Sequence, residues 1–499
     1  MTLMLFCDCN NEHQKCNHSK KNNQNTFYHS YLPLCFFSQT SQKYLLYSLP
    51  VLFRTNSFLL YHKQKPPATL CQNQTDCLHY LITISHLNQH FFSNSITIKS
   101  DKINGFLLAN SKYNTLCYLS ESEYEKTVNA HNYSENEIPE KAIKHHLVVE
   151  QDLDEVTELL KRAYLYNHDV NTETLYFVIA PTMACNYKCV YCFEHNRDLL
   201  CSDYMSEGTI QDIINFIKRC SKAFKKTKKI SIKWFGGEPL LRIDVIEKIA
   251  NGIRHDFANE DGIELYQFII TNGRLLTREI AERLANIGIK RAQITIDGMP
   301  ETYAKMKGCK ESDFYTVVEN IKNTQDLINI SVRVNVADYN KDEVKQLADY
   351  LDEQGIKTGF YTAWVQQYTK EATDTTSVNA DDYNKIYHDT TCYINDEKKN
   401  LYSNVGFPAH STGCEACREN HWCITPDGSL YCCEHLLGNE QYKIGSVTEG
   451  IYKDSKRDIW MKPNIPPKCL SCRLLPRCLI NCITDRDVEH IPVNCDFLM

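Results

Sequence analysis

Short apolar runs alternate with amphipathic segments through the middle of the chain. The runs have the length and β-branched content of buried strands, and they fall at residues 175–180, 230–234, 266–270, 292–296, 331–336 and 358–364. Apolar residues at helical spacing follow between them, most clearly at 209–220, 277–287 and 341–354. Six strand-then-helix units predict a parallel sheet with right-handed crossovers. Six is fewer than the eight units of a closed barrel, so we expect an α/β fold, a partial TIM-like (β/α)6 barrel over residues 174–366, with its chemistry at the carboxyl ends of the strands.

Residues 1–95 lack this periodicity. They are rich in Asn, Gln, His, Ser and Tyr, and no Asp or Glu stands between Glu12 and Asp76. Such a composition cannot bury a sizeable core. We therefore predict a low-complexity or disordered N-terminal extension.

Residues 96–173 have the pattern of a small folded module. Residues 105–109 read as a strand, and Ser120 and Glu123 have the spacing of a capping box at the start of a helix. Residues 152–166 carry an apolar stripe of helical period. The pattern leaves two interpretations open, a plain extension that packs on the barrel and a module that docks a peptide.

Cysteine replaces periodicity as the main pattern in residues 367–499. The chain holds 24 cysteines among 499 residues, and they cluster at ligand spacings, unlike those of short disulfide-bonded secreted proteins. We predict a metal-organised C-terminal domain and a reducing compartment, the cytoplasm. A net charge of -7 argues against a nucleic-acid partner, and no apolar run is long enough to predict a membrane span.

Cys185, Cys189 and Cys192 form a Cys-x3-Cys-x2-Cys motif directly after the first predicted strand. Three thiolates at this spacing hold three irons of a 4Fe-4S cube and leave the fourth iron open, whereas four thiolates saturate every iron. An open iron binds a substrate-like molecule, as the open position of a catalytic metal does. From the residues alone, a zinc knuckle is the alternative.

A second motif, Gly236-Gly-Glu-Pro239, follows the second predicted strand. The two glycines allow backbone to approach a ligand closely, and Glu238 offers a carboxylate to an ammonium group. With the three cysteines, this motif resembles the signature of the radical S-adenosylmethionine (SAM) enzymes. The resemblance implies that the fourth iron chelates SAM, and that one electron splits SAM into methionine and a 5'-deoxyadenosyl radical.

The same resemblance implies which residues hold SAM. Gly236, Gly237, Glu238 and Pro239 are expected at its amino group, Thr295 at a polar contact and Arg333 at its carboxylate. For Thr295 and Arg333, ordinary turn chemistry at strand ends is the alternative.

The C-terminal cysteines resemble the SPASM domain, an extension of radical SAM enzymes that modify peptides and proteins. Cys414 precedes Gly428-x4-Cys433, and the spacing Cys-x2-Cys-x5-Cys-x3-Cys follows from Cys469. The resemblance implies two auxiliary 4Fe-4S clusters. Their expected ligands are Cys414, Cys417, Cys433 and Cys482 for one cluster and Cys469, Cys472, Cys478 and Cys495 for the other. Cys423 is the alternative to Cys417, and paired Cys-x2-Cys also suits zinc.

These motifs predict a radical SAM oxidoreductase that abstracts hydrogen from a ribosomally made precursor peptide and forms a thioether or carbon–carbon cross-link. Glu434, beside Cys433, is the candidate proton acceptor. A flavodoxin- or ferredoxin-type protein is the expected electron donor. We expect the peptide to pair in extended form with an exposed edge strand of the open barrel, and residues 96–173 to bind its leader.

Two alternatives remain. The first is an anaerobic sulfatase-maturing enzyme that makes formylglycine. Those relatives usually carry Gln before Gly-Gly-Glu-Pro, where this chain has Phe235. The second is an iron–sulfur electron carrier or redox sensor, which explains the cysteines but not a barrel with a SAM-type cleft.

Overall fold

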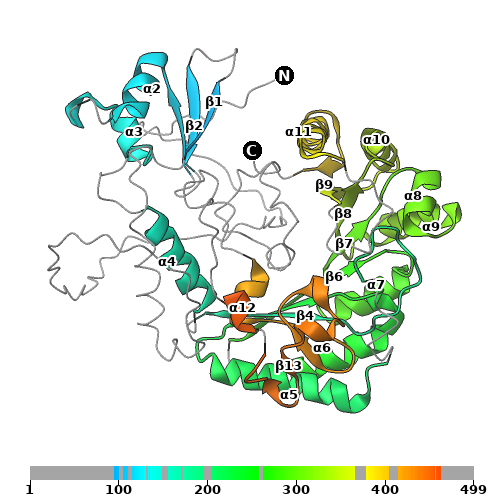
Figure 1. Ribbon diagram of the computed structural model, residues 1–499. Helices are drawn as coiled ribbons and strands as arrows, with labels where there is room; N and C mark the ends of the chain where they lie inside the picture. Colours follow the sequence, from blue (N-terminus) through cyan, green and yellow to red (C-terminus); the bar gives the residue numbers. More distant parts are fainter. Residues whose placement is uncertain are drawn as a thin grey trace, which may run out of the picture. The chain divides into compact units, whose positions relative to one another are not determined.

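The structure is a computed structural model that describes residues 95–99, 105–110, 115–130, 133, 135–148, 155–169, 172–194, 204–257, 262–365, 378–403, 414–455 and 457–461. A parallel sheet forms its centre (Figure 1). Its six strands are β4 (Thr174–Ile179), β5 (Lys229–Trp234), β6 (Glu264–Thr271), β7 (Arg291–Thr295), β8 (Asn329–Val336) and β9 (Thr358–Trp364). They pair in chain order, each parallel to the next, so the predicted α/β fold and partial barrel are confirmed.

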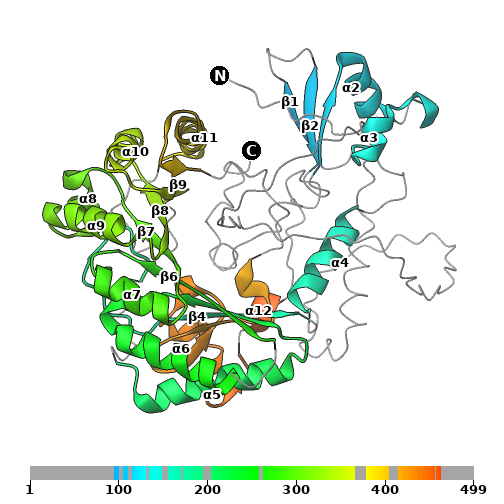
Figure 2. The same cartoon turned by 180° about the vertical axis from the view of Figure 1, so that it is seen from behind.

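Helices follow the strands of this sheet, and Figures 1 and 2 show them along its outer side. They are α5 (Glu207–Ala223), α6 (Ile243–Phe257), α7 (Arg278–Asn286), α8 (Pro300–Lys307), α9 (Glu311–Thr324) and α10 (Val344–Glu353). Apolar residues at i, i+3 and i+4 face the sheet; in α6, Ile246, Ile249 and Ile253 are all buried. Buried and half-buried side chains alternate along β7, and along β8 after its exposed first residue. The strands β4, β5 and β9 also carry consecutive buried residues, as strands covered on both faces do. This packing leaves the strand ends and the loops after them to carry the site.

The C-terminal part of the chain continues the same sheet. The strand β11 (His421–Ile424) pairs in parallel with β4, and β12 (Ser429–Tyr431), β13 (Gly445–Ser446) and β14 (Gly450–Ile451) follow in antiparallel order. At the other end, β10 (Leu401–Tyr402) pairs with the first two residues of β9.

The expectation of an exposed edge strand is therefore wrong for β4. All four residues of β11 are buried, so this strand satisfies the backbone groups of β4 and is itself covered on both faces. A peptide has no free β4 edge to pair with.

A helix absent from the sequence prediction, α11 (Ala380–Glu397), packs beside β9 and α10. Tyr383 of this helix stacks on Trp364 of β9, with ring centroids 5.9 Å apart. The sequence of this helix is mostly polar, so the apolar residues that pack on β9 give only a weak helical pattern. The boundary predicted between residues 366 and 367 stays a prediction.

The N-terminal module contains a three-stranded antiparallel sheet, ordered β1 (Ser95–Lys99), β2 (Phe106–Asn110) and β3 (Thr115–Leu119). Its helices are α2 (Glu121–Val128), α3 (Glu140–Lys144) and α4 (Glu155–Asn167). The predicted capping box is present, because Ser120 N donates to Glu123 Oε2 at 2.8 Å and Glu123 N donates back to Ser120 Oγ. Leu108, Leu119 and Leu147 form part of a small apolar core.

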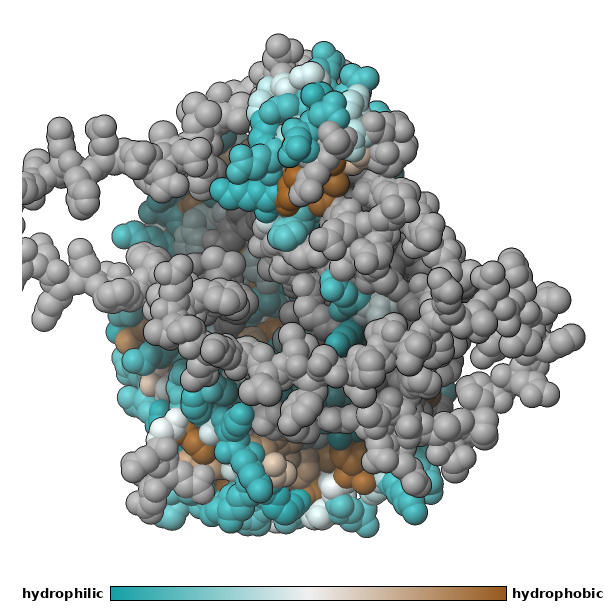
Figure 3. All heavy atoms as spheres, turned by 90° about the vertical axis from the view of Figure 1, so that its left-hand side faces the viewer, coloured by the Kyte–Doolittle hydropathy of each residue, from teal (hydrophilic) through white to brown (hydrophobic). Residues whose placement is uncertain are grey.

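Among the described residues, no helix has the length and hydropathy needed to cross a membrane. On the face drawn in Figure 3, the coloured surface is mostly hydrophilic, with small separate hydrophobic patches. The predicted N-terminal extension, up to residue 94, lies outside the described residues. Short elements complete the C-terminal part: α12 (Arg457–Met461) and the 3-10 turns Glu415–Cys417, Glu434–Leu436 and Glu440–Tyr442.

Trp422 tests whether β11 is an integral part of the barrel. Its ring is buried and stacks on Phe177 of β4, with centroids 5.2 Å apart, and it also meets Phe216 of α5 edge-on. Trp422→Ala should lower the free energy of unfolding by about 3–5 kcal/mol, because it empties this packed site. Denaturant unfolding measures the loss. Tyr452→Ala, at an exposed side chain, should change it by less than about 0.5 kcal/mol. Equal, small effects of both changes would show that the C-terminal strands are detachable.

Candidate active site

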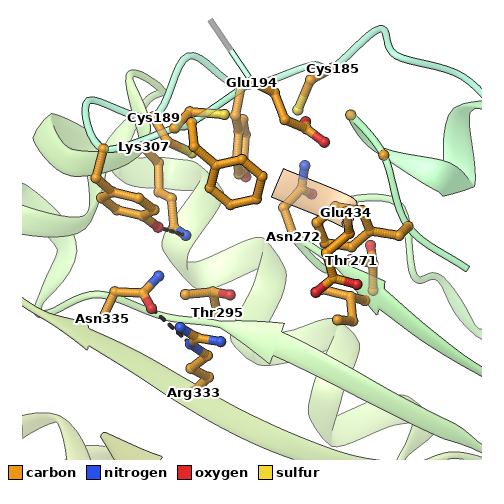
Figure 4. A pocket seen from close by; sticks show the side chains of 18 of the residues that line it. Cys185, Cys189, Glu194, Thr271, Asn272, Thr295, Lys307, Arg333, Asn335 and Glu434 are labelled. Carbon is orange, nitrogen blue, oxygen red and sulfur yellow. Dashed lines mark hydrogen bonds between the residues drawn. The ribbon is translucent and has the colours of Figure 1, made fainter. Parts of the chain in front are cut away.

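A cavity of about 760 Å³ lies at the carboxyl ends of the parallel strands (Figure 4). Its wall draws on the carboxyl ends of all six parallel strands, or the loops after them, and on the segment after β12. The side chains that line it include Cys185, Cys189, Cys192, Thr271, Asn272, Thr295, Lys307, Arg333, Asn335, Glu434 and His435. The volume lies within the range of about 300–1,000 Å³ for small-molecule sites.

The three cysteines of the first motif lie on one loop after β4, and all three line this cavity. All three side chains are partly exposed. In the described part of the chain, no group of three or more His, Cys, Asp and Glu side chains is arranged to hold a single metal ion. The loop and its chemistry fit a three-thiolate cluster open on one side.

The two glycines of the second motif allow two backbone segments to meet. Gly236 has φ +103°, and a Cβ there would lie 2.5 Å from Thr182 O. A Cβ on Gly237 would overlap the backbone of Ala184 and lie 2.5 Å from Met183 O. We expected close approach to a ligand, and the structure adds a close approach to the cysteine loop itself. Hydrogen bonds from Gly237 N and Glu238 N to that loop, at 3.2 and 2.8 Å, fasten the contact.

Glu238 lies behind the cavity wall rather than on it. Its carboxylate is 1% exposed and accepts hydrogen bonds from Thr271 Oγ1 at 2.7 Å, Asn272 N at 2.8 Å and Leu240 N at 3.0 Å. Burial raises the pKa of this carboxyl, and the three hydrogen bonds oppose the rise. Pro239 is buried at the start of the 3-10 turn Pro239–Arg242. Three of the acceptor positions that we expected to face an ammonium group are therefore taken by groups of the protein itself.

Thr295 and Arg333, the expected contacts of SAM, lie next to each other. They are register partners at the ends of β7 and β8, and both line the cavity. Arg333 Nε donates to Asn335 Oδ1 at 2.8 Å, which fixes the direction of the guanidinium (Figure 4). The arrangement presents a permanent positive charge to the cavity.

Sequence reasoning missed a buried polar group beneath the cysteine loop. Lys307 Nζ lies 2.8 Å from Asp297 Oδ2 and 2.5 Å from the hydroxyl of Tyr191, which also donates to Asp297. Lys307 and Tyr191 line the cavity. The signals were the Asp-Gly pair after β7 and a lysine before Gly308 at the end of α8. Neither signal separates such a group from ordinary turn chemistry.

The segment after β12 brings Glu434 into the cavity wall. Its Oε2 lies 2.8 Å from Lys233 Nζ, on β5. Burial acts to raise the pKa of Glu434, but the charge of Lys233 prevails and lowers it. The carboxyl group is therefore ionised near neutral pH.

Two of the predicted auxiliary-cluster cysteines flank one 3-10 turn: Cys414 precedes the turn Glu415–Cys417, and Cys417 ends it. A hydrogen bond from Cys417 lowers the pKa of Cys414 to about 7, and Cys417 N donates to Cys414 O at 3.0 Å. Cys423 is fully buried among apolar residues, and burial raises the pKa of its thiol. Cys433 is half-buried after β12. The remaining predicted ligands, Cys469, Cys472, Cys478, Cys482 and Cys495, lie outside the described residues.

Comparison with known proteins agrees with the geometry of the three-cysteine loop. Residues 179–351 match the Radical SAM superfamily. Fe-coproporphyrin III synthase from Methanosarcina barkeri (strain Fusaro / DSM 804) is 28% identical over 180 residues, which cover 35% of this chain and 40% of that protein. GTP 3',8-cyclase from Clostridium perfringens (strain 13 / Type A) is 24% identical over 310 residues, which cover 58% of this chain and 90% of the cyclase.

Among solved structures, anSMEcpe with bound AdoMet shares the fold, with a TM-score of 0.50 and 19% identity over 63% of this chain and 90% of that chain. The same protein with AdoMet and the Cp18Cys peptide also gives a TM-score of 0.50, at 18% identity. The cofactors of a radical SAM domain are a 4Fe-4S cluster and SAM, and the residues around the cavity fit them.

Proposed function

We propose that this protein, whose residues 179–351 form a radical SAM domain, is an enzyme that modifies a ribosomally made peptide. When bound, the cluster and SAM supply one-electron cleavage of SAM and abstraction of a hydrogen atom from the substrate. The proposal includes a thioether or carbon–carbon cross-link as the product, auxiliary clusters on the C-terminal cysteines, and a flavodoxin- or ferredoxin-type electron donor. The proposed compartment is the cytoplasm, because thiolate ligands of a cluster need reducing surroundings.

One observation carries the proposal. A single cavity is lined both by the three cysteines after β4 and by Glu434 and His435 after β12. A substrate in it would lie between the cluster loop and the C-terminal cysteine segment. That position suits a reaction in which a C–H bond is broken at one wall and an electron and a proton leave at the other.

Each group of residues around the cavity has its own role in this proposal. Cys185, Cys189 and Cys192 hold the cluster, and Arg333 offers its guanidinium to the carboxylate of SAM. Thr295, its register partner, gives a polar contact at the same wall. Glu434, an ionised carboxylate at the wall after β12, is the proposed acceptor of the proton that leaves the oxidised substrate. The apolar part of the wall excludes water and orients the substrate.

The N-terminal module supports a peptide as substrate. Its small sheet and helices have their own apolar core, so it suits the binding of a leader segment remote from the reacting residue. The solved structure of anSMEcpe, which shares the fold, holds a peptide named Cp18Cys.

A precursor peptide encoded beside this chain tests the proposal. Fluorescence anisotropy should show that the full chain binds the labelled precursor. Mass spectrometry should show that the product has lost two hydrogens per cross-link. A chain that begins after residue 148 keeps α4, whose end contacts the C-terminal part through Glu419 N and Asn167 O. It should bind the precursor at least tenfold more weakly, yet cleave SAM at the basal rate without substrate.

Two results would contradict this assignment. Tight binding of a sulfatase peptide with formylglycine formation and no cross-link would establish the sulfatase-maturing alternative. Phe235, which stands where those relatives usually carry Gln, stacks with Phe193 at the cavity wall with ring centroids 6.3 Å apart. Turnover of GTP without any peptide would instead place the protein with the cyclases.

A further inference from the structure

We propose that the Lys307–Asp297 pair sets how easily the SAM-binding cluster is reduced, with Lys307 favouring the reduced state and Asp297 opposing it. Both act as positioning residues through the cysteine loop and its charge, without binding iron. The inference rests on the proposed cluster at Cys185, Cys189 and Cys192.

The pair is buried at a place where charge is costly. Lys307 is 3% exposed and Asp297 is fully buried. Moving two ions out of water costs several kcal/mol for each ion, which only excellent geometry repays. That geometry is present: Asp297 Oδ2 accepts from Lys307 and Tyr191, and Oδ1 accepts from Asn335 N at 2.7 Å. Such a group is unlike a core filler, because apolar residues would fill the same volume at less cost.

The pair is also tied to the cysteine loop by backbone contacts. Lys188 N donates to Lys307 O, and Val190 N donates to Met306 O, each at 3.0 Å. Gly308, at φ +59°, ends α8 where a Cβ would lie 2.5 Å from Lys188 O. The hydroxyl of Tyr191, from the residue before Cys192, completes the attachment. The last turn of α8 therefore holds the loop that carries the three thiols.

The charge of Lys307 reaches the cluster position. Figure 4 shows its side chain beside Cys189 at the cavity wall. Asp297 Oδ2, 2.8 Å from Lys307 Nζ in the same buried site, favours the charged form of the lysine. The ammonium group is therefore charged, and a fixed positive charge in a low-dielectric site stabilises added negative charge nearby.

Reduction adds one electron, and hence one negative charge, to the cluster. Dithionite supplies the electron in the test, and no proton or bond change is required. Lys307→Met should lower the equilibrium constant for reduction about tenfold, equivalent to 59 mV for one electron. Asp297→Asn should raise it by a similar factor, because it leaves Lys307 without its counter-charge.

The measurement is an anaerobic redox titration of the full reconstituted chain, followed by EPR. The cluster in question is the one whose signal changes when SAM is added. Lys305→Met is the matched control, because Lys305 is an exposed lysine on the same helix. The reduction potential of the cluster in this variant should equal that in the unsubstituted chain. Each single variant leaves one buried charge without its partner and can therefore misfold. The double variant Lys307→Met/Asp297→Asn removes both charges and so avoids this problem. It should fold and give a potential between those of the two single variants.

Shifts of opposite sign in the two single variants would support the inference, because a general loosening of the loop moves both potentials in one direction. Shifts of the same sign, or changes below twofold in all three variants, would overturn it. So would an unchanged potential with weakened SAM binding, which would make Lys307 a ligand of SAM. An unsubstituted chain without a SAM-responsive cluster would refute the proposed function itself.

Discussion

Simultaneous replacement of Cys185, Cys189 and Cys192 by alanine is expected to abolish the formation of 5'-deoxyadenosine from SAM. Iron content should fall by about four atoms from roughly twelve, since each 4Fe-4S cluster contributes about four. The rest of the chain should stay folded, because the three side chains are partly exposed at the cavity and the barrel core is built from other residues. Anaerobic iron and sulfide assays, product chromatography with dithionite, and circular dichroism measure the three effects.

Cys392→Ala is the control for this variant, because Cys392 is an exposed cysteine on α11, away from the cavity wall. It should leave SAM cleavage and iron content unchanged. If the triple variant still cleaves SAM, the cleaving cluster lies elsewhere in the chain. Stoichiometric zinc with only about four irons in the unsubstituted chain would refute the auxiliary clusters. It would still agree with a cluster on Cys185, Cys189 and Cys192.

Among substitutions that add one methyl group to the cavity wall, Gly237→Ala should reduce SAM cleavage most. The added Cβ would overlap the backbone of Ala184 and press on Met183 O, and backbone cannot move aside as a flexible side chain can. We expect the cysteine loop to shift, with at least a hundredfold loss of SAM cleavage, because a displacement of about 1 Å at a reacting site costs that much. Cluster loading and cleavage rate, measured on the same sample, test this.

Gly208→Ala provides the matched control. This glycine lies in α5, and a Cβ there would meet only Ser206 Oγ at 3.6 Å, an ordinary contact. The change should leave cleavage intact and stabilise the helix by up to about 1 kcal/mol. Full activity of Gly237→Ala would mean that the two loops do not depend on their close approach.

The repeating units of the barrel were predictable because each strand and helix carries its own period. The strand at residues 358–364 was predicted at its observed bounds, and that at 331–336 within two residues of its start. In contrast, α11 was missed, because its mostly polar sequence shows little of the face that packs on β9. The pairing of β11 with β4 was also missed. Its register partners, such as Trp422 and Phe177, are 245 positions apart in the chain, so they leave no local signal of their contact.

The candidate site divides in the same way. By itself, the sequence determined that three thiolates follow the first strand and that Gly-Gly-Glu-Pro follows the second, because ligand spacing and motif order are properties of the chain alone. Tertiary structure decided that Glu238 turns behind the wall, that Glu434 meets Lys233 at the cavity, and that Lys307 and Asp297 pair beneath the cysteine loop. These contacts join residues from separate strands and helices. Their geometry, burial and charge exist only once the sheet has closed around them.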